Sequence, residues 1–119
     1  MPISGDSVQV SSGNLSVASS GKLSMAFTDS SATPGNATIG TPSGRCAIAA
    51  AASAVVVTNP LVTAASQILV VNEGPTANNT GALICVPGAG SFTVTSVSAI
   101  GAAQAATAAN KFSWMILNP

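Results

Sequence analysis

The apolar residues of this chain recur with the period of β-strands. Ser91–Val97 alternates apolar and hydroxyl side chains, which places Phe92 and Val94 on one face and two threonines on the other. Val55–Thr58 and Ile68–Val71 are continuous runs of mainly β-branched residues, a pattern typical of strands that are covered on both faces. Two further runs are expected to be strands: Ala82–Val86, which closes at Pro87-Gly88, and Phe112–Leu117.

Clusters of Pro, Gly and Asn separate these runs. They are Thr33-Pro34-Gly35-Asn36, Thr41-Pro42-Ser43-Gly44, Asn59-Pro60, Asn72-Glu73-Gly74-Pro75 and Asn78-Asn79-Thr80-Gly81. Short strands at this spacing predict an all-β fold, either a jelly-roll-like knob or a β-sandwich.

Two alanine-rich stretches have the composition of helices. Ala49–Ala52 lies between expected strands, so we interpret it as a tight turn in which small side chains allow close packing. Ala102–Ala109 is expected to form a turn or two of helix, because alanine is the best helix former.

Charge is scarce: charged residues make up 5% of the 119 residues, and ordinary soluble domains hold about 25%. The six are Asp6, Asp29, Glu73, Lys22, Arg45 and Lys111, and they cancel to a net charge of zero. We therefore expect Ser, Thr and Asn to carry the solubility, and other chains to cover much of the surface.

The same composition argues against several partners. Three basic residues are too few for nucleic acid, because affinity grows with the number of phosphates neutralised. The longest weakly polar run, Cys46–Val57, is shorter than the roughly 20 residues that span a bilayer. No secretory signal is visible at the start of the sequence, so synthesis in a cytoplasm is expected.

The phrase SSGNLSVASSGKLSMA at Ser11–Ala26 repeats eight residues almost unchanged. Each copy offers a short strand, Leu15-Ser16-Val17 or Leu23-Ser24-Met25, that is too short to bury an apolar face alone. One interpretation is an attachment segment over residues 1–43 that precedes a β-knob over 44–119; the other is an accidental echo within a hairpin. For the first, the expected assembly residues are Val8, Val10, Leu15, Val17, Leu23, Met25, Phe27 and, on the last strand, Trp114.

Residues for catalysis or metal binding are few. The chain has no histidine, its three carboxylates are scattered at 6, 29 and 73, and no serine lies in a nucleophile motif. Gly88-Ala89-Gly90 lacks the Lys-Ser/Thr of a phosphate loop and fits a hairpin turn. We therefore predict no enzyme activity, no metal site and no cofactor.

Trp114 and the two cysteines each allow two interpretations. Phe112, Trp114 and Ile116 share one face of a strand, so a core or subunit-contact role for Trp114 is favoured over a ligand platform. Cys46 and Cys85 sit in apolar runs, which favours buried free thiols over a disulfide between them.

From Gly44 onward the chain resembles a β-module common in tailed-bacteriophage virion proteins. The matching elements are Gly44–Ala47, Val55–Asn59, Leu61–Ser66, Gly90–Thr93 and Phe112–Leu117. Such modules occur in head decoration (cement) proteins, head spikes and tail-fibre parts, usually as homotrimers. The chain departs from the pattern at Ala52, where a turn glycine is frequent.

The resemblance implies a structural virion protein. The leading expectation is a decoration protein that binds the major capsid protein on the capsid surface and forms a homo-oligomer, which the resemblance implies is a trimer. The alternative is a tail-fibre or spike module that recognises a bacterial surface glycan through Trp114 or residues 72–81. A third hypothesis, an exported adhesin or surface-layer subunit, is disfavoured by the absence of a visible signal.

Overall fold

The computed structural model describes residues 12–13, 16–17, 19–22, 25–74, 82–98 and 101–118. Within these residues the chain forms eight strands and no helix. The strands are β1 (Phe27–Asp29), β2 (Ala37–Thr38), β3 (Ser43–Ile48), β4 (Ala54–Thr58), β5 (Gln67–Gly74), β6 (Ala82–Gly88), β7 (Ser91–Val97) and β8 (Asn110–Leu117).

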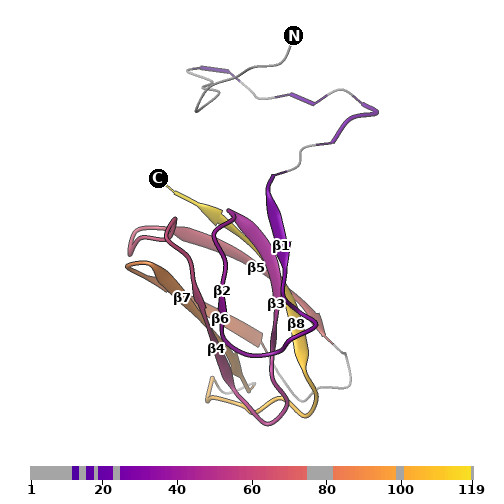
Figure 1. The fold of residues 1–119 in the computed structure, drawn as a ribbon, viewed down its shortest axis with the longest axis vertical. Coiled ribbons are helices and arrows are strands. Elements are labelled where there is room, and N and C mark those ends of the chain that lie inside the picture. Colours follow the sequence, from indigo (N-terminus) through magenta and orange to yellow (C-terminus); the bar gives the residue numbers. More distant parts are fainter. Residues whose placement is uncertain are drawn as a thin grey trace.

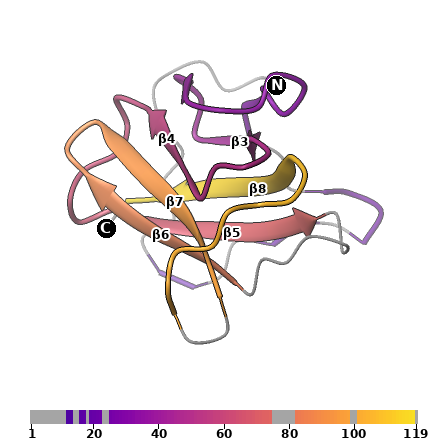
Figure 2. The same cartoon turned by 90° about the horizontal axis from the view of Figure 1, so that it is seen from below.

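The strands form two four-stranded sheets that pack face to face (Figures 1 and 2). The first sheet has the order β1-β3-β8-β5 and the second the order β2-β4-β7-β6. The pairs β1–β3 and β2–β4 are parallel, and the other pairs are antiparallel. The expected all-β sandwich is therefore confirmed, whereas its jelly-roll-like variant stays a prediction.

The core lies between the sheets and is built from alternate residues of the inner strands. Phe92 and Val94 of β7 point inward, as their alternation predicts, and are 1% and 0% exposed. Phe112, Trp114 and Ile116 of β8 face them from the other sheet. The rings of Phe92 and Trp114 meet edge to face, with centroids 5.1 Å apart and planes at 65°.

Gly44 of β3 makes room for that indole. It lies between Thr28 of β1 and Trp114 of β8 in one row across the sheet. A Cβ on Gly44 would stand 2.6 Å from the Thr28 carbonyl oxygen and 2.7 Å from Trp114 Cζ2. Glycine is therefore required here for close approach rather than for an unusual backbone angle.

The two alanine-rich stretches meet at one end of the sandwich. Ala49–Ala52 forms the expected tight turn between β3 and β4, and Ala51 there adopts a φ of 67°. The expected helix over Ala102–Ala109 is wrong. This segment is extended and irregular, because its backbone bonds to other loops: Ala51 N–H donates to Ala106 O, and Ala106 N–H donates to Ala52 O, at 2.8 and 2.9 Å.

The turn predictions have mixed outcomes. Ala89 and Gly90 close the β6–β7 hairpin, and Asn59-Pro60 opens the turn after β4, both as expected. Asn72-Glu73-Gly74 lies inside β5, where the register shifts against β8, so its turn residues form a bulge. The signal at 78–81 falls outside the described residues.

The expectation that β4 and β5 are covered on both faces is wrong for this chain by itself. Their outward side chains are open to solvent: Val56 is 36% exposed, Leu69 51% and Val71 62%. Only the inward faces are covered, because the sandwich has two layers and nothing within the described residues lies over these side chains.

The expected division between residues 43 and 44 falls inside β3. The two short strands before it, β1 and β2, belong to the sheets, since each is the edge partner of a longer strand. The described residues between 12 and 22 are all exposed and lie apart from both sheets in Figure 1.

Candidate assembly surface

The expected assembly residues have different positions in the structure. Val8, Val10, Leu15 and Leu23 lie outside the described residues. Val17, Met25 and Phe27 are exposed, at 44%, 40% and 53%. Trp114 is 3% exposed and packs in the core, which is one of the two roles expected for it.

Phe27 stands at one end of a row of side chains across the outer face of the first sheet. The register places Phe27 opposite Ser43, Ser43 opposite Met115, and Met115 opposite Leu69. Side chains in one such row point to the same side of a sheet. The chain before β1 therefore enters the fold beside exposed apolar side chains of the first sheet, Phe27 and Leu69.

A shallow hollow of about 200 Å³ lies on this face between β5 and β8. Its lining is Leu69, Val71, Ser113, Trp114 and Met115. Only one of these side chains is hydroxylic and none is charged, so the hollow suits an apolar side chain of another protein better than a polar ligand.

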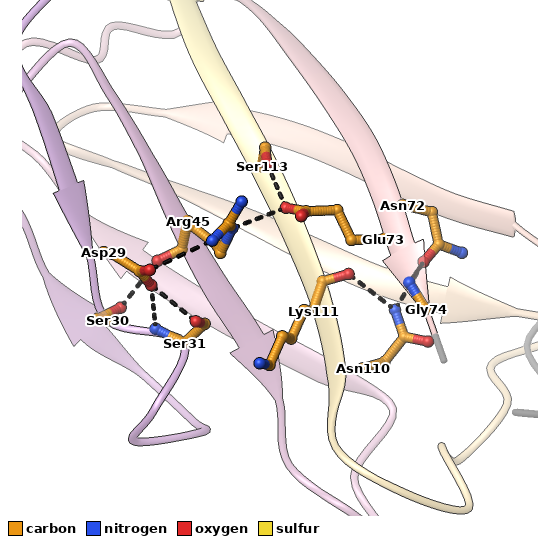
Figure 3. Close-up of polar contacts among 10 residues, drawn as sticks. All are labelled: Asp29, Ser30, Ser31, Arg45, Asn72, Glu73, Gly74, Asn110, Lys111 and Ser113. Carbon is orange, nitrogen blue, oxygen red and sulfur yellow. Dashed lines mark hydrogen bonds and ion pairs between the residues drawn. The ribbon is translucent and has the colours of Figure 1, made fainter. Parts of the chain in front are cut away.

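Next to the hollow, three charged residues form a cluster from three strands (Figure 3). Arg45 Nη1 lies 3.3 Å from Asp29 Oδ2, and Arg45 Nε lies 3.0 Å from Glu73 Oε2. Ser113 of β8 donates a hydrogen bond to Glu73 between them. The cluster ties the short edge strand β1 to β3, and β3 to β5 across β8.

Hydrogen bonds stabilise the ionised carboxylates. Ser31 donates its hydroxyl and its N–H to Asp29 Oδ1 at 2.7 and 2.9 Å, and these bonds, with Arg45 beside them, lower the pKa of Asp29. The Ser113 hydroxyl and then Arg45 lower the pKa of Glu73. Glu73 in turn raises the pKa of Arg45, so all three groups are charged at neutral pH.

The outer face of the second sheet repeats the apolar and hydroxyl pattern. Val56 of β4 and Val86 of β6 flank Thr93 of β7 in one row. Ala54 and Ile84 stand on either side of a threonine in the next. Both outer faces thus expose aliphatic side chains beside hydroxyls, and the outer face of the first sheet also carries the ion cluster.

Chemistry at other positions is limited in the part of the chain that the structure describes. No cluster of three metal-binding side chains occurs there, and no helix there is long and apolar enough to cross a bilayer. Cys46 and Cys85 are free; Cys46 is buried in the first sheet, and burial raises the pKa of the Cys85 thiol to about 11. That thiol is protonated at neutral pH and is a poor nucleophile.

Sequence patterns did not indicate the parts of this surface contributed by β5 and β8. The apolar run Ile68–Val71 predicts that Leu69 and Val71 are covered, whereas both are exposed. The three charged residues are far apart in the sequence, and only the register of β1, β3, β8 and β5 brings them together. The sequence feature that could have indicated this surface is the continuous apolar run Ile68–Val71 in β5. A strand with one face in solvent usually alternates apolar and polar residues, so the run is unusual there.

No protein-family model, no curated protein and no solved structure matches this chain.

Proposed function

We propose that this protein is a structural component of a bacteriophage virion, a decoration protein that binds the outer surface of the capsid and stabilises the shell. The observation that carries the proposal is the row on the outer face of the first sheet in which Phe27 and Leu69 are exposed, with Ser43 and the partly exposed Met115 between them; Phe27 follows the repeat-bearing segment directly. The resemblance to virion β-modules supports the same class.

The proposed mechanism is mechanical. Neighbouring major capsid proteins are bridged by short-range apolar contacts, which must break before the shell bursts. Long-range charge attraction contributes little, because Arg45 is already paired with Asp29 and Glu73 within the chain. The proposed assembly is a homo-oligomer, a trimer by the resemblance, in which several weak contacts act together.

The rival glycan-binding function loses its main support. The aromatic ring that the sequence offers as a glycan platform is Trp114, and it is 3% exposed and packed against Phe92. Of its other candidate residues, 72–74 form the end of β5, and 75–81 lie outside the described residues. The decoration function therefore stands as the proposal.

The test is binding to shells assembled from the major capsid protein of the same phage. Co-sedimentation measures how much purified protein saturates the shells, for the wild type and for a Met25→Ser/Phe27→Ser variant. We expect the variant to fold and to bind at least about tenfold more weakly, because two exposed apolar contacts are lost. Val56→Ser on the second sheet is the matched control and should bind as the wild type does.

A truncated protein provides a second test of shell binding. Removing residues 1–24 deletes all of the repeat except Met25 and Ala26 and keeps β1, whose Asp29 pairs with Arg45. We expect a folded protein that no longer binds shells. If the truncated protein still saturates them, the attachment role of the repeat is wrong, and if the wild type does not bind them, the decoration function is wrong.

A further inference from the structure

Acid can act on the described fold at one place. The side chains that take up a proton in acid are carboxylates and histidine. The chain has no histidine, and Asp29 and Glu73 are the only carboxylate side chains in the part of the chain that the structure describes. Both belong to the ion cluster, in which Arg45 lies between them (Figure 3). The acid response of the described fold is therefore concentrated at this cluster.

The strand that the cluster reaches, β1, has few other contacts. None of its three residues is buried, and none belongs to the core between the sheets. It pairs with β3 at three positions, whereas β5 pairs with β8 at seven. Its remaining bonds are polar: the Thr28 and Thr41 hydroxyls bond to each other, and the following Ser30 N–H donates to Arg45 O at 2.8 Å. An element with so little apolar burial can open locally before the rest of a protein unfolds.

The cluster holds β1 by its last residue. Asp29 is the cross-strand partner of Arg45, and its Oδ2 lies 3.3 Å from Arg45 Nη1. The other side of the guanidinium, Nε, lies 3.0 Å from Glu73 Oε2, and Ser113 donates a hydrogen bond to the same carboxylate. Protonation of Asp29 removes the charge that Arg45 binds on β1. Protonation of Glu73 removes the charge that holds Arg45 in position.

The sign of the pH dependence follows from these bonds. Hydrogen bonds from Ser31, and then Arg45, lower the pKa of Asp29 below 3.8, and the Ser113 hydroxyl, and then Arg45, lower the pKa of Glu73 below 4.5. The contribution of each carboxylate is therefore fully present above its ordinary value. It is lost as the pH falls through the lowered one.

The other charged residues of the described fold do not join the cluster. Lys111 lies on the same outer face of β8, two residues from Ser113, but none of the ion pairs among the described residues includes it. Lys22 is exposed in the segment that lies apart from both sheets (Figure 1). Asp29 is thus bound by one cation, Arg45, and faces one other carboxylate, Glu73.

We propose that β1 is a releasable edge strand: when acid discharges the ion cluster, β1 leaves β3 while the rest of the sandwich stays folded. The core between the sheets is apolar and contains no residue of β1. The chain has only three Lys and Arg side chains, so protonation of all its carboxylates leaves little charge to unfold it by repulsion. The inference goes beyond the proposed function and does not depend on it.

Release of β1 uncovers one edge of Trp114. A Cβ on Gly44 would stand 2.6 Å from the Thr28 carbonyl oxygen and 2.7 Å from Trp114 Cζ2, so only a glycine separates β1 from the indole. The buried indole Nε1 has no hydrogen-bond partner among the described residues, and water that enters there provides one. Phe27 and the chain before it leave the outer face of the first sheet at the same time.

The test is amide hydrogen exchange of the full chain between pH 5 and pH 2.5, corrected for intrinsic exchange rates. The Ser30 N–H, which donates to Arg45 O, reports on β1, and the Ser96 N–H, which donates to Ser53 O at 2.7 Å, reports on the second sheet. We expect the protection of Ser30 to fall by about tenfold as the two exposed ion pairs are lost, and that of Ser96 to stay. Trp114 emission should shift to longer wavelength while circular dichroism keeps the strand signal.

Variants separate the cluster from a general effect of acid. In Asp29→Asn/Glu73→Gln the Ser30 amide should exchange rapidly at both pH values, because neither side chain titrates. Lys111→Gln, which removes a charge from the same face outside the cluster, is the matched control and should keep the wild-type response. Glu73→Gln alone should reduce the response if the double variant does not fold. A wild type whose Ser30 protection is independent of pH, or is lost together with that of Ser96, overturns the proposal, and so does a full response in the folded double variant.

Discussion

The close approach at Gly44 makes a strong prediction about the first sheet. In Gly44→Ala the new Cβ would lie 2.6 Å from the Thr28 carbonyl oxygen and 2.7 Å from Trp114 Cζ2, and both distances are shorter than real Cβ contacts. Neither neighbour yields easily, because one is backbone of β1 and the other is a ring packed edge to face on Phe92. Either β1 moves off β3, or the indole leaves its place in the core.

The expected cost is about 3 kcal/mol, the upper part of the usual range for overpacking, because two rigid groups are hit at once. For a chain of this size that corresponds to a fall of roughly 12 °C in the melting temperature. Urea unfolding followed by fluorescence measures it directly, since Trp114 is the sole tryptophan and lies at the perturbed position. Gly40→Ala is the matched control, because no atom lies within 4 Å of a Cβ there, and it should change stability little.

A double-mutant cycle tests the cause. Trp114→Phe removes the part of the indole nearest Gly44, together with an Nε1 that is buried without a hydrogen-bond partner. Gly44→Ala should therefore cost less in the Trp114→Phe background than in the wild type. A Gly44→Ala protein that unfolds at the wild-type urea concentration, or an equal cost in both backgrounds, would refute the steric argument.

Three other predictions concern the turn, the ion cluster and the half-buried thiol. Ala51→Gly should stabilise the protein by about 0.5–1 kcal/mol in urea unfolding, because its φ of 67° suits glycine, whereas Ala50→Gly should destabilise it. Asp29 and Glu73 have pKa values below the ordinary 3.8 and 4.5, so their contribution to stability is present above those values and is lost as the pH falls through the lowered ones. Glu73→Gln should therefore lose less stability than the wild type between about pH 5 and pH 3, and an equal loss would contradict the cluster's role. Alkylation of Cys85, with its pKa near 11, should speed up about tenfold per unit from about pH 8 to pH 10, and a plateau below pH 9 would contradict its burial.

The longer strands could be predicted from the sequence, because each carries its own signal. The alternation in Ser91–Val97 and the aromatic face of Phe112–Leu117 both correspond to strands of the structure with the expected inward residues. The short strands β1 and β2 have no such signal. Three and two residues show no period, and they are strands only because β3 and β4 offer them an edge.

The wrong helix prediction and the missed ion cluster both depend on contacts between segments that are far apart in the sequence. Ala102–Ala109 has high intrinsic helix propensity, but a short helix without large apolar residues gains little from packing, and bonding to the 49–52 turn stabilises the extended form instead. The ion cluster depends on register. Asp29 and Arg45 are direct cross-strand partners, and Glu73 reaches them from β5 across Ser113, so neither contact follows from spacing along the chain.

The position of β1 connects this cluster to the proposed attachment. Any load on the segment before Phe27 must pass to the sandwich through β1, a three-residue strand that pairs only with β3. Three residue pairs between β1 and β3 would resist little force by themselves, but two other features stabilise β1. Gly44 lets β1 lie close against β3 and the indole, and the chain's one arginine binds Asp29 at the end of β1. Half of the six charged residues of this chain thus form one cluster that links β1, where the proposed attachment segment enters, to β3 and β5. Under the proposed function, the pairing of β1 with β3 has to withstand the force on the attachment segment when the shell is under pressure.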